Sequence, residues 1–226
     1  LGSLRYDRFC GGKGLNQSIA LAHAGAKVWH AGKVGSDGVW LKDRLKRAGV
    51  NTSLVEVVDG PSGHAIIQVD RGGENSIILH GGANRAITPA DAERVLRRFS
   101  AGDYLLLQNE ISSLAAIMSL AARLGMKIVL NPAPMSRELL GCPLKLVSCF
   151  ILNEVEGADL TGEKSAARIL RTMMKRYSGA ATVLTRGARG VLYGKAGQVL
   201  EAPAVKVRAV DTTAAGDTFV GYFLGA

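Results

Sequence analysis

The chain has 226 residues, a formal net charge of +9 and an apolar content of 47%. It contains no apolar run of membrane-spanning length, and it does not open with a charged and then apolar leader that ends at a small-residue cleavage site. These features argue against a membrane protein or a secreted one, so we expect a soluble protein of the cytoplasm with no membrane partner.

Helical periodicity and short apolar runs alternate along the chain. Apolar positions at helical spacing predict helices at residues 16–24, 40–48, 89–98, 113–124 and 165–177. Unbroken apolar segments, typical of strands that a parallel sheet buries on both faces, predict strands at residues 28–30, 104–107, 127–130, 149–152 and 182–184. Because a parallel crossover needs a connecting helix, the alternation predicts an α/β fold with a doubly wound, mostly parallel sheet.

One segment departs from this alternation. Residues 63–69 and 75–80 form two extended runs, joined by the turn-forming stretch D-R-G-G-E at 70–74. This pattern predicts a β-hairpin, which could act as a small lid. No linker or repeat divides the chain, so we expect one domain over residues 1–226 with the lid at about 63–80.

Cysteines and basic clusters give no further site. Cys10, Cys142 and Cys149 form neither a C-x-x-C pair nor an even disulfide set, which suits a reducing compartment and argues against a structural zinc.

The basic clusters at 42–47, 94–98 and 168–176 interleave with apolar residues at helical spacing. Solvated helix faces account for them better than a nucleic-acid surface does, although salt-sensitive nucleic-acid binding remains an alternative.

The segment 210–219, V-D-T-T-A-A-G-D-T-F, runs through small residues into a helix. Unpaired N–H groups at a helix start form a site for an anion such as a phosphate. Asp217, set inside these amides, is placed to accept a proton from a substrate hydroxyl. The alternative is that Asp217 only caps the helix.

The same segment resembles the signature D-T-x-[GA]-A-G-D-x-F of ribokinase-type carbohydrate kinases, the pfkB family. Segments 11–17 (G-G-K-G-L-N-Q), 82–84 (G-A-N), 108–110 (Q-N-E) and 130–134 (L-N-P-A-P) are similar to ribokinase segments in the same order. The resemblance implies a ribokinase-like fold and transfer of the ATP γ-phosphoryl to a primary hydroxyl of a small sugar. It favours D-ribose, which would become ribose 5-phosphate.

The resemblance also implies roles for individual residues. Asp217 would be the catalytic base, with the amides of Ala214, Ala215 and Gly216 stabilising the transferring group. The sugar would be bound by Asp217 and by Gly12, Lys13, Gly14, Asn16 and Glu110. Taken without the family, the glycine-rich turn is more simply a packing feature, and Glu110 a surface acid.

Two further motifs concern the nucleotide. Segment 153–156, N-E-V-E, fits the family motif N-x-x-E, and segment 185–190, T-R-G-A-R-G, resembles T-x-G-x-x-G. The resemblance assigns ATP to Asn153, Glu156, Thr185, Gly187, Ala188, Arg189, Gly190 and Gly216. Mg²⁺ would be held by Glu156 through water. By themselves, the two strings fit a helix cap and a tight turn equally well.

The resemblance further implies K⁺ as an activator, bound by the carboxylate of Asp211 and the carbonyl of Thr213, and a homodimer formed through the lid. Trp40 departs from the family pattern. It lies shortly after the segment 34–37, V-G-S-D, near a position where the family usually has a further glycine. Family members also begin with a strand that carries a sugar-binding Asp and continue past the signature, so both termini appear truncated. We expect this chain alone to be unstable or to bind ligands weakly.

Other functions stay open at this point. A kinase for deoxyribose, fructose, 2-keto-3-deoxygluconate or adenosine would carry the same family motifs. A non-catalytic sugar- or nucleotide-binding relic is the alternative outside the enzymes. The expected partners are a small sugar and ATP, with no nucleic acid.

Overall fold

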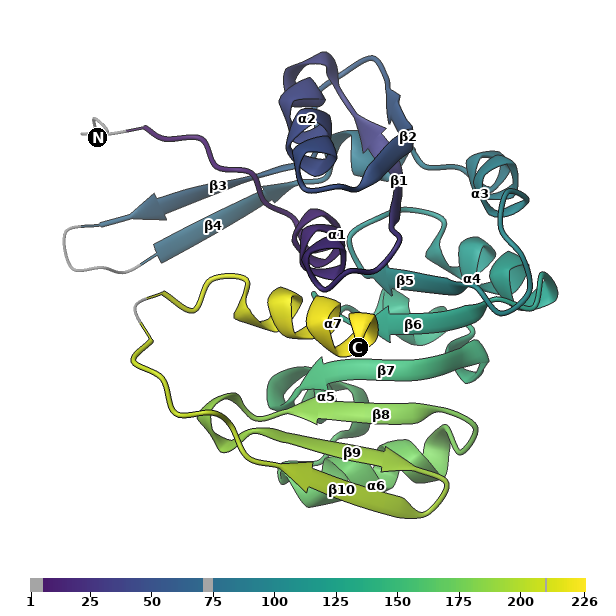
Figure 1. The fold of residues 1–226 in the computed structure, drawn as a ribbon, viewed down its shortest axis with the longest axis vertical. Helices are drawn as coiled ribbons and strands as arrows, with labels where there is room; N and C mark the ends of the chain where they lie inside the picture. The colour runs from purple at the N-terminus through teal and green to yellow at the C-terminus, as the bar shows by residue number, and fades with distance from the viewer. Residues whose placement is uncertain (1–5, 71–74, 210) are drawn as a thin grey trace. The chain divides into compact units, whose positions relative to one another are not determined.

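The computed structural model describes residues 6–70, 75–209 and 211–226, so part of the predicted turn, 71–74, lies outside the described residues. The chain forms two compact units. The first unit comprises Leu1–Ala83 together with Asp217–Ala226, and the second unit comprises Asn84–Gly216. Figure 1 labels their helices and strands.

The first unit combines helices, a short parallel strand pair and a hairpin. Its elements are α1 (Lys13–His23), β1 (Trp29–Val34), α2 (Val39–Arg47), β2 (Asn51–Val57), β3 (His64–Val69), β4 (Asn75–His80) and nearly all of α7 (Ala215–Gly225). β1 and β2 pair in parallel. Leu15, Leu45 and Val50 form a small buried cluster in this unit.

The predicted hairpin is confirmed. β3 and β4 pair antiparallel, with His64 opposite His80 and Val69 opposite Asn75. All side chains of β3 are exposed. Because side chains alternate between the faces of a strand, one face of the hairpin gathers apolar groups. This apolar hairpin face consists of Ala65, Ile67, Val69, Ile77 and Leu79.

The second unit is built on a mixed sheet in the order β10-β9-β8-β7-β6-β5. Its strands are β5 (Tyr104–Gln108), β6 (Lys127–Asn131), β7 (Val147–Asn153), β8 (Ala181–Thr185), β9 (Val191–Lys195) and β10 (Gln198–Ala202). β5 to β8 are parallel, whereas β9 and β10 add as antiparallel strands. The helices are α3 (Pro89–Leu96), α4 (Leu114–Arg123), α5 (Glu154–Thr161) and α6 (Ala166–Arg176), with α4 to α6 drawn behind the sheet in Figure 1.

The central strands confirm the predicted α/β fold. Ile128, Val129 and Leu130 are consecutive and fully buried. Because neighbouring side chains of a strand point to opposite faces, β6 is covered on both faces, as the unbroken apolar run predicts. Within the described residues, moreover, no helix has both the length and the apolar character needed to cross a bilayer.

Several elements were not predicted: β2, α5, β9 and β10. The β9–β10 turn consists of Ala196 and Gly197, both with positive φ (49° and 84°). Ala-Gly is a weaker turn signal than Asn-Gly or Asp-Gly. In α5 the helical pattern is interrupted by Gly157, where a Cβ would lie 2.6 Å from Cγ2 of Ile169, so glycine lets α5 and α6 approach each other.

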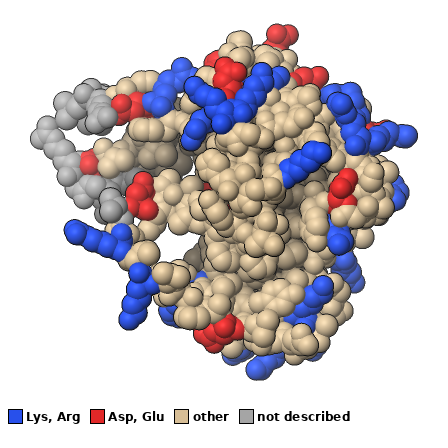
Figure 2. Space-filling view, viewed as in Figure 1, with Lys and Arg blue, Asp and Glu red and all other residues tan. Residues whose placement is uncertain are grey.

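The predicted basic clusters lie on helix surfaces and are partly paired with acids. On α3, Arg94 pairs with Asp91 at 2.7 Å. On α6, Arg168 pairs with Glu163 at 2.8 Å. On the face shown in Figure 2, Lys and Arg are spread among acidic and uncharged residues and do not merge into one basic patch. The paired arginines of α3 and α6 fit the prediction that these clusters are solvated helix faces.

Candidate active site

Asp217 lies in the first turn of α7 with only 7% of its surface exposed. Its Oδ2 accepts a hydrogen bond of 3.0 Å from Nδ2 of Asn16, and its Oδ1 accepts one of 2.9 Å from Nε2 of Gln17. Both donors belong to α1, so these bonds tie Asp217 to a neighbouring helix and not to the backbone of α7. A buried carboxylate needs such donors, because an unsatisfied one is costly.

The contact between α1 and α7 explains how the carboxylate reaches these amides. Gly221 lies one turn beyond Asp217, and a Cβ there would be 2.3 Å from Cβ of Ala20. Gly225 lies one turn further, and a Cβ there would be 2.6 Å from Cβ of Ala24. Residues four apart share a helix face, so the two glycines let α7 approach α1 along the same face that carries Asp217.

Gln17 was not among the predicted site residues. It has no exposed surface, and it directly follows Asn16, to which the sequence did assign a role. The sequence offers one signal for a role of Gln17: its polar side chain lies between the apolar residues Leu15 and Ile19 of an amphipathic helix. Its partner, 200 positions away, could not be read from the sequence.

The glycine-rich turn leads directly into α1. Gly12 precedes the helix with φ of 95°, which favours glycine, and a Cβ at Gly11 or Gly12 would meet nothing within 4 Å. Lys13 and Gly14 are the first residues of α1 and are partly exposed. Gly11 and Gly12 therefore leave open space before the start of α1, the helix that carries Asn16.

In the second unit, the remaining predicted residues follow the carboxyl ends of parallel strands. Gln108 of β5 is in register with Asn131 of β6, and Asn153 of β7 with Thr185 of β8. The loop with Glu110 and the two predicted nucleotide segments thus lie at one edge of the sheet. Ligands of open α/β sheets bind at this edge.

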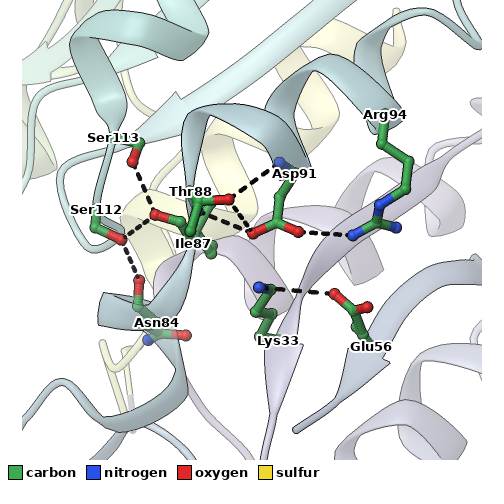
Figure 3. Close-up of polar contacts among 9 residues, drawn as sticks. All are labelled: Lys33, Glu56, Asn84, Ile87, Thr88, Asp91, Arg94, Ser112 and Ser113. Carbon is green, nitrogen blue, oxygen red and sulfur yellow. Dashed lines mark hydrogen bonds and ion pairs between the residues drawn. The ribbon is translucent and has the colours of Figure 1, made fainter.

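The loop that carries Glu110 is held by hydroxyl groups. Ser112 Oγ and Ser113 Oγ donate to the carbonyl oxygen of Ile87, at 2.7 and 2.8 Å. The backbone N–H of Ser112 donates to the carbonyl oxygen of Asn84 at 3.1 Å. Figure 3 shows both serines pointing to the chain between Asn84 and Ile87, so the Glu110 loop and the G-A-N segment are joined.

Asn153 and Glu156 form a capping box at the start of α5. Glu156 N–H donates to Oδ1 of Asn153 at 2.9 Å, while Oε2 of Glu156 accepts from the backbone N–H of Asn153 at 3.0 Å. Nδ2 of Asn153 also donates to Oε1 of Glu156, at 3.1 Å. The capping role is therefore present, and any bond from Glu156 to a metal-bound water would add to these contacts.

The loop at 185–190 has a fixed shape. Gly190 has φ of 86°, and a Cβ there would lie 2.1 Å from the carbonyl oxygen of Ala202. The backbone N–H of Arg186 donates to the carbonyl oxygen of Gly190 at 2.8 Å. Arg189 forms an ion pair with Glu154 in the first turn of α5. This pair joins the two segments that were predicted to bind ATP.

The signature segment forms tight turns before α7. Oδ1 of Asp211 accepts a hydrogen bond of 2.8 Å from the backbone N–H of Thr213, which lowers the pKa of the Asp211 carboxyl. The backbone N–H of Ala215 donates to the carbonyl oxygen of Thr212 at 3.1 Å, so in this conformation it is engaged within the segment. Across the residues that the structure describes, no cluster of three His, Cys, Asp or Glu could hold a metal ion.

The comparisons with known proteins agree with these motifs. The model of the pfkB family carbohydrate kinases matches residues 5–226. The ribokinase of Haemophilus influenzae is 37% identical over 98% of this chain and 75% of its own length. The deoxyribokinase of Salmonella typhimurium is 34% identical over 95% of this chain and 73% of its own length. The chain thus spans about three quarters of the length of these relatives.

The fold comparison gives the same result. The structure of Arabidopsis thaliana ribokinase complexed with ribose and ATP superposes with a TM-score of 0.81 at 27% identity, over 95% of this chain and 73% of that one. A match of the family model over nearly the whole chain, together with relatives above 30% identity, shows the family. The chain belongs to the pfkB family of carbohydrate kinases.

Proposed function

We propose that this protein transfers the γ-phosphoryl group of ATP to a primary hydroxyl of a small sugar, with D-ribose as the substrate and ribose 5-phosphate as the product. The observation that carries the proposal is the buried carboxylate of Asp217, held by Asn16 and Gln17 at the start of α7. The Arabidopsis relative, whose structure contains ribose and ATP, supports both substrates.

In this proposal, Asp217 orients the sugar hydroxyl and takes its proton as the oxygen attacks the phosphorus. The turn at Gly12, Lys13 and Gly14 binds the other hydroxyls, together with Asn16 and Glu110. Because both amide groups that hold Asp217 are fixed by α1, the carboxylate needs little reorganisation when the sugar arrives.

The nucleotide binds at the edge of the second unit. Its proposed ligands are Asn153, Thr185, Gly187, Ala188, Arg189, Gly190 and Gly216. The backbone amides of Ala214 and Gly216 stabilise the charge on the transferring group, and Ala215 joins them when its N–H leaves the carbonyl of Thr212.

Two metal ions complete the proposal. Hard oxygen donors suit both ions, and the carboxylates of Glu156 and Asp211 supply such oxygens. Glu156 would hold Mg²⁺ through water, and the bound ion would supply positive charge that screens the phosphates. Asp211 and the carbonyl of Thr213 would hold K⁺; the Asp211 carboxyl is ionised at neutral pH, and the hydrogen bond from the N–H of Thr213 lowers its pKa further.

We further propose that residues 1–226 belong to one kinase domain in the cytoplasm, with the β3–β4 hairpin as its lid. The apolar hairpin face (Ala65, Ile67, Val69, Ile77 and Leu79) exposes more than half of each of its four larger side chains, Ile67, Val69, Ile77 and Leu79. A two-stranded ribbon with such a face favours pairing with a second copy, so the lid is the proposed homodimer contact.

The test is a coupled assay of ADP release with ribose, deoxyribose, fructose, 2-keto-3-deoxygluconate and adenosine. We expect the highest kcat/KM with ribose, and a loss of at least about 100-fold in kcat for Asp217→Asn, because proton transfer typically contributes factors of this size. Asp43→Asn, on α2, is the matched control. A higher kcat/KM with deoxyribose would favour the second candidate, supported by the deoxyribokinase relative.

The same assay separates the kinase from a non-catalytic relic. A relic would bind sugar or ATP in calorimetry without releasing ADP. Absence of ADP release with every sugar, from a protein that binds ATP, would overturn the proposed function.

A further inference from the structure

Asp37 and Ser62 form a compact hydrogen-bonded contact within the first unit. Oδ1 of Asp37 accepts from the backbone N–H of Ser62 at 2.9 Å and from its hydroxyl at 2.8 Å. The same hydroxyl oxygen accepts from the backbone N–H of Gly35 at 2.9 Å. Ser62 is 5% exposed, so its hydroxyl is satisfied from both sides in a nearly closed environment.

Ser62 lies where the chain enters the hairpin. β3 begins at His64, whose Nδ1 lies 2.9 Å from the carbonyl oxygen of Ser62. The ring of His64 faces the ring of His80 on β4, with the centroids 4.9 Å apart. The first residue pair of the hairpin is therefore attached directly to Ser62.

The chain that leaves the hairpin meets the same point. A Cβ on Gly82 would lie 2.5 Å from the carbonyl oxygen of Pro61 and 2.6 Å from that of Ser62. The backbone N–H of Ala83 donates to the carbonyl oxygen of Pro61 at 2.9 Å. Both ends of the hairpin are thus packed against Pro61 and Ser62.

The loop before α2 packs closely against the chain that enters the hairpin. A Cβ on Gly35 would lie 2.1 Å from the carbonyl oxygen of Gly60, and a Cβ on Gly38 would lie 2.1 Å from Oγ of Ser62. Glycine at both positions therefore lets the loop 35–38 pack directly against the chain at Gly60 and Ser62, where a side chain would not fit.

We propose that Asp37 and Ser62 form a clamp that sets the direction in which the β3–β4 hairpin leaves the first unit, which makes them positioning residues for the sugar kinase reaction. The role in the reaction rests on the proposed function. In this proposal the V-G-S-D segment, which contains Asp37, orients the hairpin, whereas the other motifs bind the sugar and the nucleotide. Neither residue contacts a reacting atom in this proposal.

A test of the clamp does not require turnover. Spin labels at Gln68→Cys on β3 and Arg44→Cys on α2, in a background without Cys10, Cys142 and Cys149, report a distance within the first unit. We expect a narrow distance distribution for the labelled parent, and a wider one for Ser62→Ala and for Asp37→Ala, which removes the acceptor oxygen of both hydrogen bonds. Asp59→Ala, which removes an exposed carboxylate in the loop that carries Ser62, is the matched control and should leave the distribution narrow.

Kinetics then test the role in the reaction. Loss of the hydrogen bonds to the Asp37 carboxylate changes the equilibrium constant for holding the hairpin by about tenfold. We therefore expect KM for the sugar to rise about tenfold in either variant. KM for ATP should stay unchanged, and ATP hydrolysis without sugar transfer should rise, because a misdirected hairpin excludes water less well. The double variant should resemble the single ones, since the two residues act through one contact.

The outcomes separate the two ideas. An unchanged distance distribution in both variants would overturn the clamp. Wider distributions with normal sugar KM and normal coupling would overturn the positioning role. If the parent protein phosphorylates no sugar, the proposed function fails, whereas the distance measurement still decides whether Asp37 and Ser62 hold the hairpin.

Discussion

Gln17 and Asp217 are 200 positions apart in the chain, yet Nε2 of Gln17 donates a hydrogen bond of 2.9 Å to Oδ1 of Asp217. Gln17 has no exposed surface. With Asn16 on the other oxygen, the carboxylate is held by two amide groups from one helix turn. This arrangement fixes the plane of the carboxylate, which a base needs if it is to face one hydroxyl of its substrate.

The first prediction concerns Gln17. In Gln17→Leu, Oδ1 of Asp217 loses its donor in a buried position, which costs about 1–3 kcal/mol. If this cost appears in full in the transition state, we expect kcat for the sugar to fall by about 5- to 160-fold, by the conversion of 1.36 kcal/mol per factor of ten, with KM for ATP unchanged. Steady-state kinetics of Gln17→Leu and of Gln198→Leu, an exposed control on β10, measure the difference. Equal kcat values in the two variants would contradict the role of Gln17.

The second prediction concerns the approach of α7 to α1. Gly221→Ala would place a methyl group 2.3 Å from Cβ of Ala20, so the helices must separate. Overpacking of this kind costs about 1–3 kcal/mol, and the separation moves Asp217 away from its amide donors. We expect a lower melting temperature together with a lower kcat. Gly179→Ala, where a Cβ meets nothing within 4 Å, should change neither the melting temperature nor kcat. A Gly221→Ala variant with wild-type kcat would show that catalysis does not need the close approach of α7 to α1.

These two residues also show what a sequence can and cannot provide. The strands of the central sheet were predicted because residues such as Ile128, Val129 and Leu130 form an unbroken apolar run, which is a local property. Asp217, Asn16 and Lys13 were assigned to the site because they belong to recognisable motifs. The donor role of Gln17 and the tight fit at Gly221 depend on two helices far apart in sequence, and no local pattern encodes the distance between them.

The same reasoning applies to the capping and turn residues. Asn153 and Glu156 were predicted to bind the nucleotide, with a helix cap as the alternative, and the cap is present. A cap is a local interaction and is readable from four residues. Contact with a phosphate depends on how the strand ends are arranged, which the sequence of the motif alone does not determine.

The third prediction concerns the proposed potassium site. Asp211→Asn retains an oxygen that can accept from the N–H of Thr213 but loses the negative charge. If Asp211 holds K⁺, the ratio of activity in K⁺ to activity in Na⁺ should exceed one in the parent and fall towards one in the variant. Initial rates in matched chloride salts measure this ratio, and Asp159→Asn on α5 is the control. A variant that keeps the parent's ratio would exclude Asp211 as a ligand.

The last prediction concerns His30 of β1. Burial lowers its pKa from 6.5 to about 4, and Nδ1 of His30 lies 2.8 Å from Oγ of Ser18 on α1. In the unfolded chain the imidazole takes up its proton near pH 6.5, so between pH 6.5 and 4 the unfolded state binds more protons than the folded state. The contribution of His30 to the free energy of unfolding should therefore be constant above pH 6.5 and should fall as the pH decreases towards 4.

The size of this effect follows from the shift. At 1.36 kcal/mol per pKa unit, the full shift corresponds to at most about 3 kcal/mol, and the partial exposure of His30 reduces that value. Denaturant unfolding at a series of pH values, for the parent and for His30→Gln, measures it. We expect the variant to lose most of the decline between pH 6.5 and 4, whereas His23→Gln, at an exposed position of α1, should follow the parent. Parallel curves for His30→Gln and the parent would mean that His30 takes up its proton at the same pH in the folded and the unfolded chain, so that burial does not lower its pKa.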